Sequence, residues 1–202
     1  MKKKHIDDVF RHNFLQSVKL YKACAKDDAT RPVMECVHFE DGYAFASDSH
    51  VAVRMKIDGI SNLEPEEIEK LNGKTIHGSH FKQLLDCDVI TEITDEGITA
   101  TNIAASSIEE KQTFFKFKND CKYPKIQEVF QTALGKSKNG ASKLGIKPKL
   151  LLEASDAMDA GKQGVVMEIT NDREAIVVYP ISILMRSYAV AIVMPVMVTD
   201  ED

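Results

Sequence analysis

The sequence predicts an α+β fold built from three repeats of a short amphipathic helix followed by an antiparallel β-hairpin. Each hairpin joins two segments of alternating β-formers through acidic, asparagine or glycine residues, which suit a tight antiparallel turn. The three hairpins lie at 35–47, 89–100 and 165–178. A repeated unit that cannot bury its own apolar face must stack against copies of itself. We therefore expect three packed units, with sheets on one side and helices on the other.

The first unit is predicted to begin with a helix over 13–26, capped by Asn13. Apolar residues recur at helical spacing along one side of this segment, and lysines recur three or four apart along the other. The apolar set is Phe14, Val18, Tyr21 and Ala25, and the basic set is Lys19, Lys22 and Lys26. Strands are expected at 33–39, 43–47 and 50–57.

A short helix over 65–71 is expected to connect the first and second units. The second unit has a predicted strand at 74–77, a helix at 79–86, and strands at 89–94, 97–102 and 105–117. Residues 119–141 break the pattern, and 134–142 is predicted to be a linker or mobile loop. The third unit has a strand at 143–146, a helix at 148–160, the third hairpin and an apolar strand at 187–198.

Composition is that of an ordinary globular protein of one or two domains, with 202 residues, 44% hydrophobic and 28% charged. The net charge of −5 argues against a surface that is basic all over, although a local basic face remains compatible with it. The amino terminus lacks the apolar stretch of a secretory signal, and no run approaches the ~20 apolar residues of a membrane span. Cys24, Cys36, Cys87 and Cys121 form no Cys-x-x-Cys pair. We expect a cytoplasmic protein with reduced thiols.

No catalytic or metal-binding motif is predicted. Asp48, Ser49 and His50 are residue types of a catalytic triad, but a working triad draws them from separate elements. His77 and His80 could share a metal, yet no further ligand follows at zinc-like spacing, so they are expected to flank a helix start. We expect no catalytic residue, no metal and no cofactor.

Three segments resemble, in the right order, the bacterial DNA polymerase III beta subunit, which is the DNA sliding clamp. Residues 29–53 are similar to the clamp's middle domain, in which a strand and a short turn lead to Ala-Thr-Asp-Gly-His-Arg-Leu-Ala. Residues 122–130 resemble the Phe-Pro-Asp-Tyr segment that follows that domain, and 190–198 resemble the carboxyl-terminal strand, which ends in Val-Met-Pro-Met-Arg-Leu. The resemblance implies a DNA-clamp fold.

The sequence also departs from the family. The first clamp domain and half of the last one have no counterpart, the Gly-His-Arg-Leu turn is one residue shorter, with Ser49 for the glycine, and the terminal Arg-Leu is replaced by Met197-Val198. The resemblance thus implies a shortened relative. Its expected parts are a flexible amino terminus (1–12), a full clamp-like domain (13–120), a crossover and loop (121–142), a half domain (143–198) and an acidic tail (199–202).

The resemblance implies a non-catalytic replication or repair processivity factor, an accessory subunit that surrounds or apposes double-stranded DNA and docks polymerase-type partners through short peptides. The alternative is a homologue without ring closure, which binds clamp-interacting peptides as a competitor or adaptor. A third reading is an unrelated enzyme with convergent repeats. Known clamp rings close with twelve units, so three units per chain imply a homo-oligomer of four chains if a ring forms. The third unit is expected to expose a sheet edge that seeks a partner.

Two surfaces follow from the resemblance. The implied peptide pocket comprises Met34, Ser47, Ser49, His50, Val51, Pro124, Glu128, Val129, Val193, Met194, Pro195, Val196 and Met197. The implied DNA-facing residues are Lys19, Lys22, Lys26, Lys82, Lys147 and Lys149. Flexible methionines suit a surface that accepts several peptides, whereas Val193 and Val196 are equally compatible with the end of a core strand. The lysines are equally compatible with a solvated helix face, and Glu153, Asp156 and Asp159 give the third helix an acidic face that would repel DNA.

Overall fold

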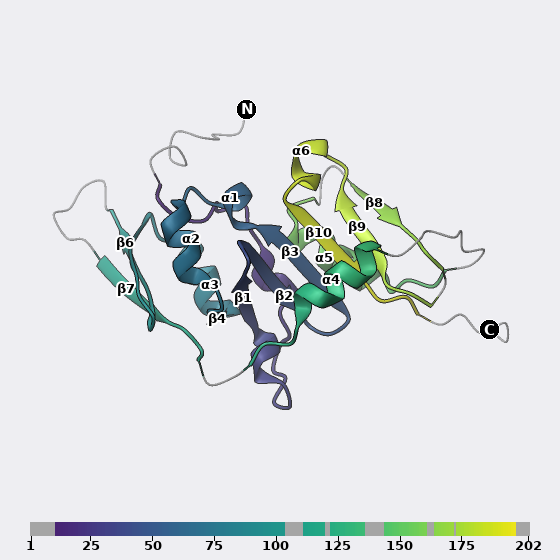
Figure 1. Ribbon diagram of the computed structural model, residues 1–202, viewed down its shortest axis with the longest axis horizontal. Helices are drawn as coiled ribbons and strands as arrows, with labels where there is room; N and C mark the ends of the chain where they lie inside the picture. Colours follow the sequence, from purple (N-terminus) through teal and green to yellow (C-terminus); the bar gives the residue numbers. More distant parts are fainter. Residues whose placement is uncertain are drawn as a thin grey trace.

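The computed structural model describes residues 11–103, 111–119, 122–135, 144–160, 164–171 and 173–196. Within them the strands form two antiparallel sheets, as Figure 1 shows. The larger sheet has seven strands in the order β4-β1-β2-β3-β10-β9-β8, and the smaller has three in the order β5-β6-β7. The expected α+β class is therefore confirmed.

The elements have the following bounds. The strands are β1 (Cys36–Glu40), β2 (Tyr43–Ser47), β3 (Val51–Lys56), β4 (Thr75–His77), β5 (Val89–Ile93), β6 (Gly97–Asn102), β7 (Lys111–Lys116), β8 (Val165–Glu168), β9 (Ile176–Pro180) and β10 (Ala189–Val193). The helices are α1 (Ile57–Ile60), α2 (Pro65–Leu71), α3 (Gly78–Leu85), α4 (Ile126–Gly135), α5 (Pro148–Ala157) and α6 (Ile183–Arg186), with 3-10 turns η1 (Leu20–Ala23) and η2 (Pro32–Glu35). No helix of this described set is long and apolar enough to cross a membrane.

The three predicted hairpins are confirmed as β1-β2, β5-β6 and β8-β9, each antiparallel. Each hairpin leads into a further antiparallel strand, β3, β7 or β10, so the repeat is structural as well as sequential. The first turn illustrates the local cause: Asp41 and Gly42 both have positive φ, at 50° and 75°. Aspartate and glycine tolerate that conformation, and it matches the twist of the flanking strands.

The first and third units share one sheet because their last strands pair. β3 and β10 run antiparallel, from Val51 opposite Val193 to Met55 opposite Ala189. In the second unit, β7 pairs with β6 and no described strand lies along its other side. Among the described strands, the unit whose last strand has an open side is thus the second. The third unit also exposes an edge, as the sequence predicted, but through β8, the outer strand of the large sheet.

The prediction of a helix over 13–26 is wrong, because the only helical element in this segment is the short turn η1. Asn13 does not cap a helix: its side-chain amide is buried and donates to the carbonyls of Leu84 and Cys87, at 2.8 and 2.9 Å. The backbone of Phe14 forms an antiparallel bridge with Ser61. Phe14 and Val18 are buried, as their apolar spacing predicted. The start of the segment is nevertheless extended, because long-range hydrogen bonds hold it in that conformation.

Helix α4 is the element that the repeat pattern missed. It begins in the segment expected to be a crossover and includes the first two residues of the predicted 134–142 linker, whose other residues lie outside the described chain. Ile126 and Phe130 pack with Phe45 and Ile192 on one face of the large sheet. Helices α3 and α5 bury their apolar residues in the larger core, on the sheet's other face (Figure 1). The large sheet is therefore covered on both faces.

Other boundaries differ from those expected. The predicted strand at 143–146 is a single bridge between Gly145 and Val196, and the apolar stretch at 187–198 forms only β10, preceded by α6. Of the strand predicted at 105–117, β7 is described and 104–110 is outside the described residues. Arg11, expected in a flexible amino terminus, is buried and donates to the carbonyl of Leu85 at 2.8 Å. The acidic tail lies outside the described residues.

Candidate peptide-binding site and charged face

An apolar cavity of about 260 Å³ lies where β3 and β10 meet the start of α4. It draws on three segments far apart in the sequence, as the clamp resemblance implied. The residues expected there that line it are Met34, Ser47, Ser49, His50, Val51, Pro124, Val129 and Met194. The further lining residues are Arg31, Ala52, Ile126 and Ile192. The alternation of apolar residues along the strands could have indicated Ala52 and Ile192, whereas Ile126 needed knowledge of α4.

A compact turn between β2 and β3 forms one wall of the cavity. The Asp48 carboxylate accepts hydrogen bonds from the backbone N–H groups of His50 and Val51, both at 2.8 Å. The Ser47 hydroxyl donates to the carbonyl of Val51 at 2.8 Å, and Ser49 has a positive φ of 79°. Asp48, Ser49 and His50, the three triad-type residues, therefore form a turn. The Asp48 carboxylate stabilises this turn by accepting backbone hydrogen bonds.

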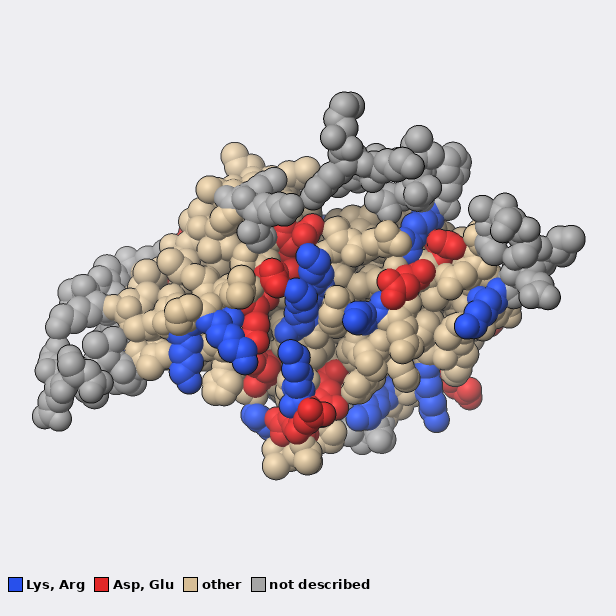
Figure 2. Space-filling view, turned by 180° about the vertical axis from the view of Figure 1, so that it is seen from behind, with Lys and Arg blue, Asp and Glu red and all other residues tan. Residues whose placement is uncertain are grey.

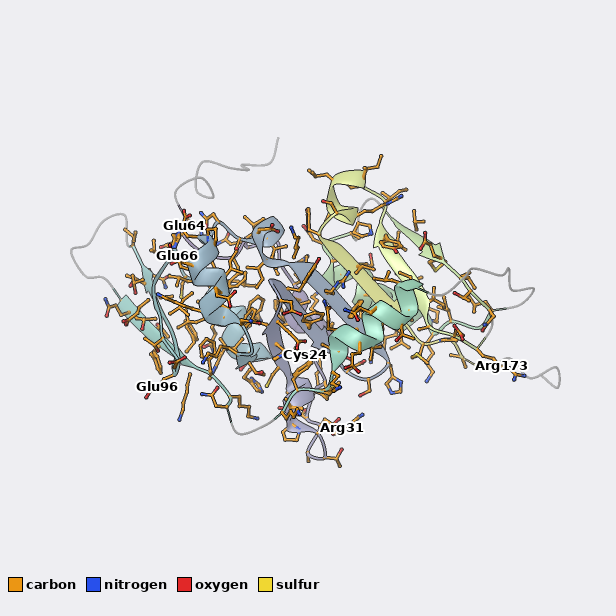
Figure 3. The ribbon with its side chains drawn as sticks, viewed as in Figure 1. Cys24, Arg31, Glu64, Glu66, Glu96 and Arg173 are labelled. Atoms are coloured by element: carbon orange, nitrogen blue, oxygen red, sulfur yellow. The ribbon has the colours of Figure 1, made fainter. Side chains whose placement is uncertain are left out.

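Arg31 stands at the rim of the cavity and was missed by the sequence analysis; Figure 3 labels it below α4. Its guanidinium donates to the Ser49 hydroxyl at 2.6 Å and to the Asp28 carboxylate at 2.9 and 3.1 Å. Hydrogen bonds from Thr30 and Arg31 lower the pKa of Asp28, so this carboxylate stays charged. The Asp28-x-x-Arg31 spacing was the signal available in the sequence. The result is a guanidinium held at the rim of an apolar hollow by its ion pair with Asp28 and its hydrogen bond to Ser49.

A second, more polar hollow of about 640 Å³ continues from the cavity along α4 to the turn between β8 and β9. Pro124, Val129 and Met194 line both. Glu128, expected in the pocket, lines this second hollow, where it forms an ion pair with Lys125 at 2.7 Å. The two hollows form one groove, with an apolar end near Met34 and a charged end near Arg173, which Figure 3 labels.

The carboxyl-terminal residues expected in the pocket are only partly brought to it. Val193 is completely buried in β10 and lies opposite Val51, as in the core-strand reading. Val196 bridges Gly145 and is not among the lining residues of either hollow, nor is the half-buried Pro195. Met197 lies outside the described residues.

Aromatic contacts hold the α4 wall against the sheet. The Phe130 ring is fully buried, and its centroid is 5.9 Å from that of Phe45. The guanidinium carbon of Arg54 lies 5.2 Å from the Phe130 centroid. At the start of the segment, the rings of His38 and Tyr123 stack in parallel with centroids 4.7 Å apart. Burial lowers the pKa of His38 to about 4, so the stacked imidazole is neutral at pH 7. The cavity therefore depends on side chains beneath α4.

The expected DNA-facing lysines lie beside acidic residues. Lys22 forms an ion pair with Asp156 at 2.6 Å, and Lys19 one with Asp159 at 3.8 Å. The hydrogen bond to Asp156 raises the pKa of Lys22. The acidic face of the third helix thus meets the basic residues of the first unit. Figure 2, seen from behind Figure 1, shows basic side chains running directly beside acidic ones.

The remaining lysines of this set are exposed. Lys26, Lys147 and Lys149 line a polar hollow of about 710 Å³, which Asp27, Asp28, Asp48 and Glu153 also line. Lys149 is 3.8 Å from the Glu153 carboxylate, and the Lys82 ammonium is 5.9 Å from the centre of the Tyr21 ring. Both signs of charge are therefore mixed across this face.

The histidine pair has a structural role. His77 caps α3 by accepting a hydrogen bond from the N–H of Ser79 at 3.2 Å, and its Nε2 lies 3.2 Å from a Glu35 oxygen. Burial lowers the pKa of His80, whose ring centroid is 5.9 Å from that of His77. Among the described residues no group of three or more His, Cys, Asp or Glu could hold a metal ion. The cap that His77 forms at the start of α3 agrees with the predicted place of the two histidines at a helix start.

Comparison with known proteins identifies the fold. No protein-family model matches the sequence, and no curated protein matches it significantly. The H. pylori beta clamp in complex with diflunisal superposes with a TM-score of 0.57 at 12% identity, covering 93% of this chain and 65% of the clamp chain. The DNA polymerase III subunit beta of Pseudomonas aeruginosa gives 0.52 at 12% identity, with 98% and 69% covered. The H. pylori clamp in complex with 5-chloroisatin gives 0.53 at 12% identity, with 98% and 68% covered.

The chain therefore has a beta-clamp fold and spans about two thirds of the length of these clamp chains. At this identity the likeness establishes the architecture, which agrees with the resemblance that the sequence motifs indicated.

Proposed function

We propose that this protein is a non-catalytic, clamp-like docking factor of DNA replication or repair in the cytoplasm. It binds short apolar peptides of polymerase-type partners in the cavity between β3, β10 and α4, and it holds them beside or around double-stranded DNA. The clamp fold supports the general class. The docking role, the DNA and the partners are parts of the proposal.

The observation that carries the proposal is the convergence of three distant segments on one apolar cavity. Residues 31–34, 47–52 and 124–129 meet β10 there, and most of the lining residues are among those that the clamp resemblance implied. Apolar clefts edged by a few polar groups are typical peptide sites. Met34 and Met194 supply flexible, polarizable surface that can adapt to different side chains.

A fluorescent peptide of the Gln-Leu-x-Leu-Phe type tests the site by anisotropy titration. Met194→Ala removes an exposed side chain from the cavity, and we expect about tenfold weaker binding, equivalent to about 1.4 kcal/mol. Met167→Ala is the matched control, because Met167 on β8 is 41% exposed against 43% for Met194 and does not line the cavity. Equal affinity of wild type and Met194→Ala would remove the site from the proposal.

Contact with DNA is the second part of the proposal. Diffuse attraction between lysines and phosphates, without base readout, is sufficient for a scaffold that slides. Lys26, Lys82 and Lys147 are exposed, and no ion pair involves them within the described part of the chain. We expect salt-sensitive retention on circular DNA that is lost when the DNA is linearised. Retention that survives linearisation would contradict encirclement.

The ion pairs of Lys19 and Lys22 favour a second candidate function. They reduce the positive charge of the face expected to meet DNA, so the chain could act as a peptide-binding competitor or adaptor without a ring. Peptide binding together with no retention on circular DNA, even at low salt, would select this alternative.

Self-association is the third part of the proposal. Three units per chain require four chains for a ring of twelve, and open sheet edges favour pairing with another chain. A strict monomer at micromolar concentration in multi-angle light scattering would contradict it.

A further inference from the structure

The last strand of the second unit, β7, lies at an open edge of the small sheet. The corresponding strands of the other two units, β3 and β10, are paired with each other over five residues each. Like β3 and β10, β7 pairs with the preceding strand of its own unit, which is β6. No described strand lies along the other side of β7. Phe114 on β7 is 52% exposed, which is unusual for an aromatic residue in the middle of a strand.

The hydrogen-bonding groups of this edge can be identified from the ladder. Phe117 donates its N–H to the carbonyl of Glu96, on the β6 side, at 2.8 Å. Because successive residues of a strand face opposite neighbours, Gln112, Phe114 and Lys116 direct their N–H groups to the open side. In the first unit Lys56 donates to the Tyr188 carbonyl, just before β10, at 2.7 Å. The open edge of β7 therefore offers the groups that β3 uses toward β10.

We propose that two copies of the chain pair through β7, antiparallel and about a twofold axis at Thr113. The proposal specifies the surface of the self-association proposed above, and it does not depend on peptide docking. A six-stranded sheet, β5-β6-β7 followed by the partner's β7-β6-β5, would result. The contact repeats between chains the pairing that β3 and β10 make within one chain.

The register is chosen from the hydrogen-bonding groups of the open side. In an antiparallel pair the outward N–H and carbonyl groups of one strand must face those of the other. An axis at Thr113, near the middle of β7, satisfies this: it sets Gln112 opposite the partner's Phe114, Lys111 opposite the partner's Phe115 and Thr113 opposite the partner's Thr113. No like charges face each other in these pairs, and each exposed Phe114 gains a neighbour. Cross-strand pairs of β-branched and aromatic residues stabilise antiparallel sheets.

Strand β4 limits the length of the contact. Beyond β7, Lys118 donates to the Thr75 carbonyl at 2.7 Å, and Phe117 forms a bridge with Ile76. The open side of the strand therefore ends near Lys116. A short contact of this kind buries less surface than a standard interface, so we expect dimerisation in the micromolar range.

A twofold contact also sets the symmetry of any ring. Joining β7 to the partner's β7 places two chains head to head, so a ring of four chains would need a second, different twofold contact to close. The proposed assembly is therefore dihedral, and it differs from a head-to-tail ring.

Blocking the edge tests the contact. Gln112→Pro removes an N–H that points to the open side, so the β6–β7 ladder keeps its bonds. Gln112→Thr is the matched control, because it retains the N–H and the preference for β structure. We expect a concentration-dependent mass rising toward at least 45 kDa, twice 22.5 kDa, for wild type and Gln112→Thr, and about half the dimer mass for Gln112→Pro at the same concentrations. Unchanged association of a folded Gln112→Pro would overturn the β7 contact while leaving self-association standing.

A crosslink tests the register. Thr113 directs its N–H toward β6, so the pair across the axis is non-hydrogen-bonded, with Cα atoms about 4.5 Å apart. That separation suits a disulfide. Under mild oxidation, Thr113→Cys is expected to form a covalent dimer that wild type does not form, whereas Lys111→Cys, far from its own copy, is not. A covalent dimer of Lys111→Cys, or none of Thr113→Cys, would overturn the register.

Discussion

Acidification should destabilise the protein through His38, which links the large sheet to the start of the α4 segment. Its imidazole is buried, its Nδ1 lies 2.9 Å from the Thr75 hydroxyl, and its ring stacks on Tyr123. Burial is the main reason that its pKa is lowered from 6.5 to about 4, because the charged form loses its hydration there. The unfolded chain therefore binds a proton at a pH where the folded chain does not.

The sign and size of the effect follow from linkage. A lowered histidine pKa in the folded state contributes stability above about pH 6.5, and this contribution is lost as the pH falls toward about 4. The full shift corresponds to roughly 3 kcal/mol. Between pH 7.5 and pH 5 the loss from this one group is about 2 kcal/mol, because the folded imidazole is still mostly neutral at pH 5.

Urea denaturation at pH 7.5 and at pH 5 measures this loss as a change in the free energy of unfolding. His38→Gln is the comparison, because an amide can still reach Thr75 but does not titrate. The lowered pKa of His80 acts in the same direction, and it remains in both proteins. We expect wild type to lose about 2 kcal/mol more than His38→Gln between the two pH values. An equal loss in the two proteins would refute the assignment of the effect to His38.

Three further perturbations test how the site is supported. Phe130→Ala should lower the free energy of unfolding by about 3–5 kcal/mol and weaken peptide binding, since the ring is completely buried under α4; urea denaturation and anisotropy measure the two effects. Asn13→Ala removes one of the donors to the carbonyls of Leu84 and Cys87 and leaves the buried Phe14 N–H without its side-chain acceptor, so denaturation should show a loss of about 1–3 kcal/mol, and an unchanged midpoint would contradict the role of Asn13. Lys22 and Asp156 are each about one third exposed, so a double-mutant cycle with Lys22→Met and Asp156→Asn should give a coupling of about 0.2–1 kcal/mol that shrinks in high salt.

Local patterns predicted the hairpins well, because their determinants lie within a few residues of each turn. The acidic and glycine residues of the turns, and the alternation of the strands beside them, are sufficient to specify β1-β2, β5-β6 and β8-β9. The pairing of β3 with β10 is long-range, and no local feature of Val51 or Val193 indicates it. That pairing decides which unit's last strand keeps an open side.

The errors have the same physical origin. The segment at 13–26 has helical spacing, but the bonds of Asn13 to Leu84 and Cys87 are tertiary and override that preference. Helix α4 buries Ile126 and Phe130 on a face that the repeat model left uncovered. The clamp resemblance implied most of the residues that line the apolar cavity. It did not indicate Arg31, because this side chain is held at the cavity by a hydrogen bond to Ser49 that the motifs do not include.

Photo-crosslinking gives the most direct test of the central claim that this clamp-like scaffold receives partner peptides between β3, β10 and α4. A peptide carrying a diazirine on its apolar anchor is irradiated with the full chain, and the labelled residues are mapped by mass spectrometry. The account predicts labels on 31–34 and 47–52, and on Val129 or Met194, from opposite walls of one cavity. Labels confined to α5 and η1, with none around the cavity, would contradict it.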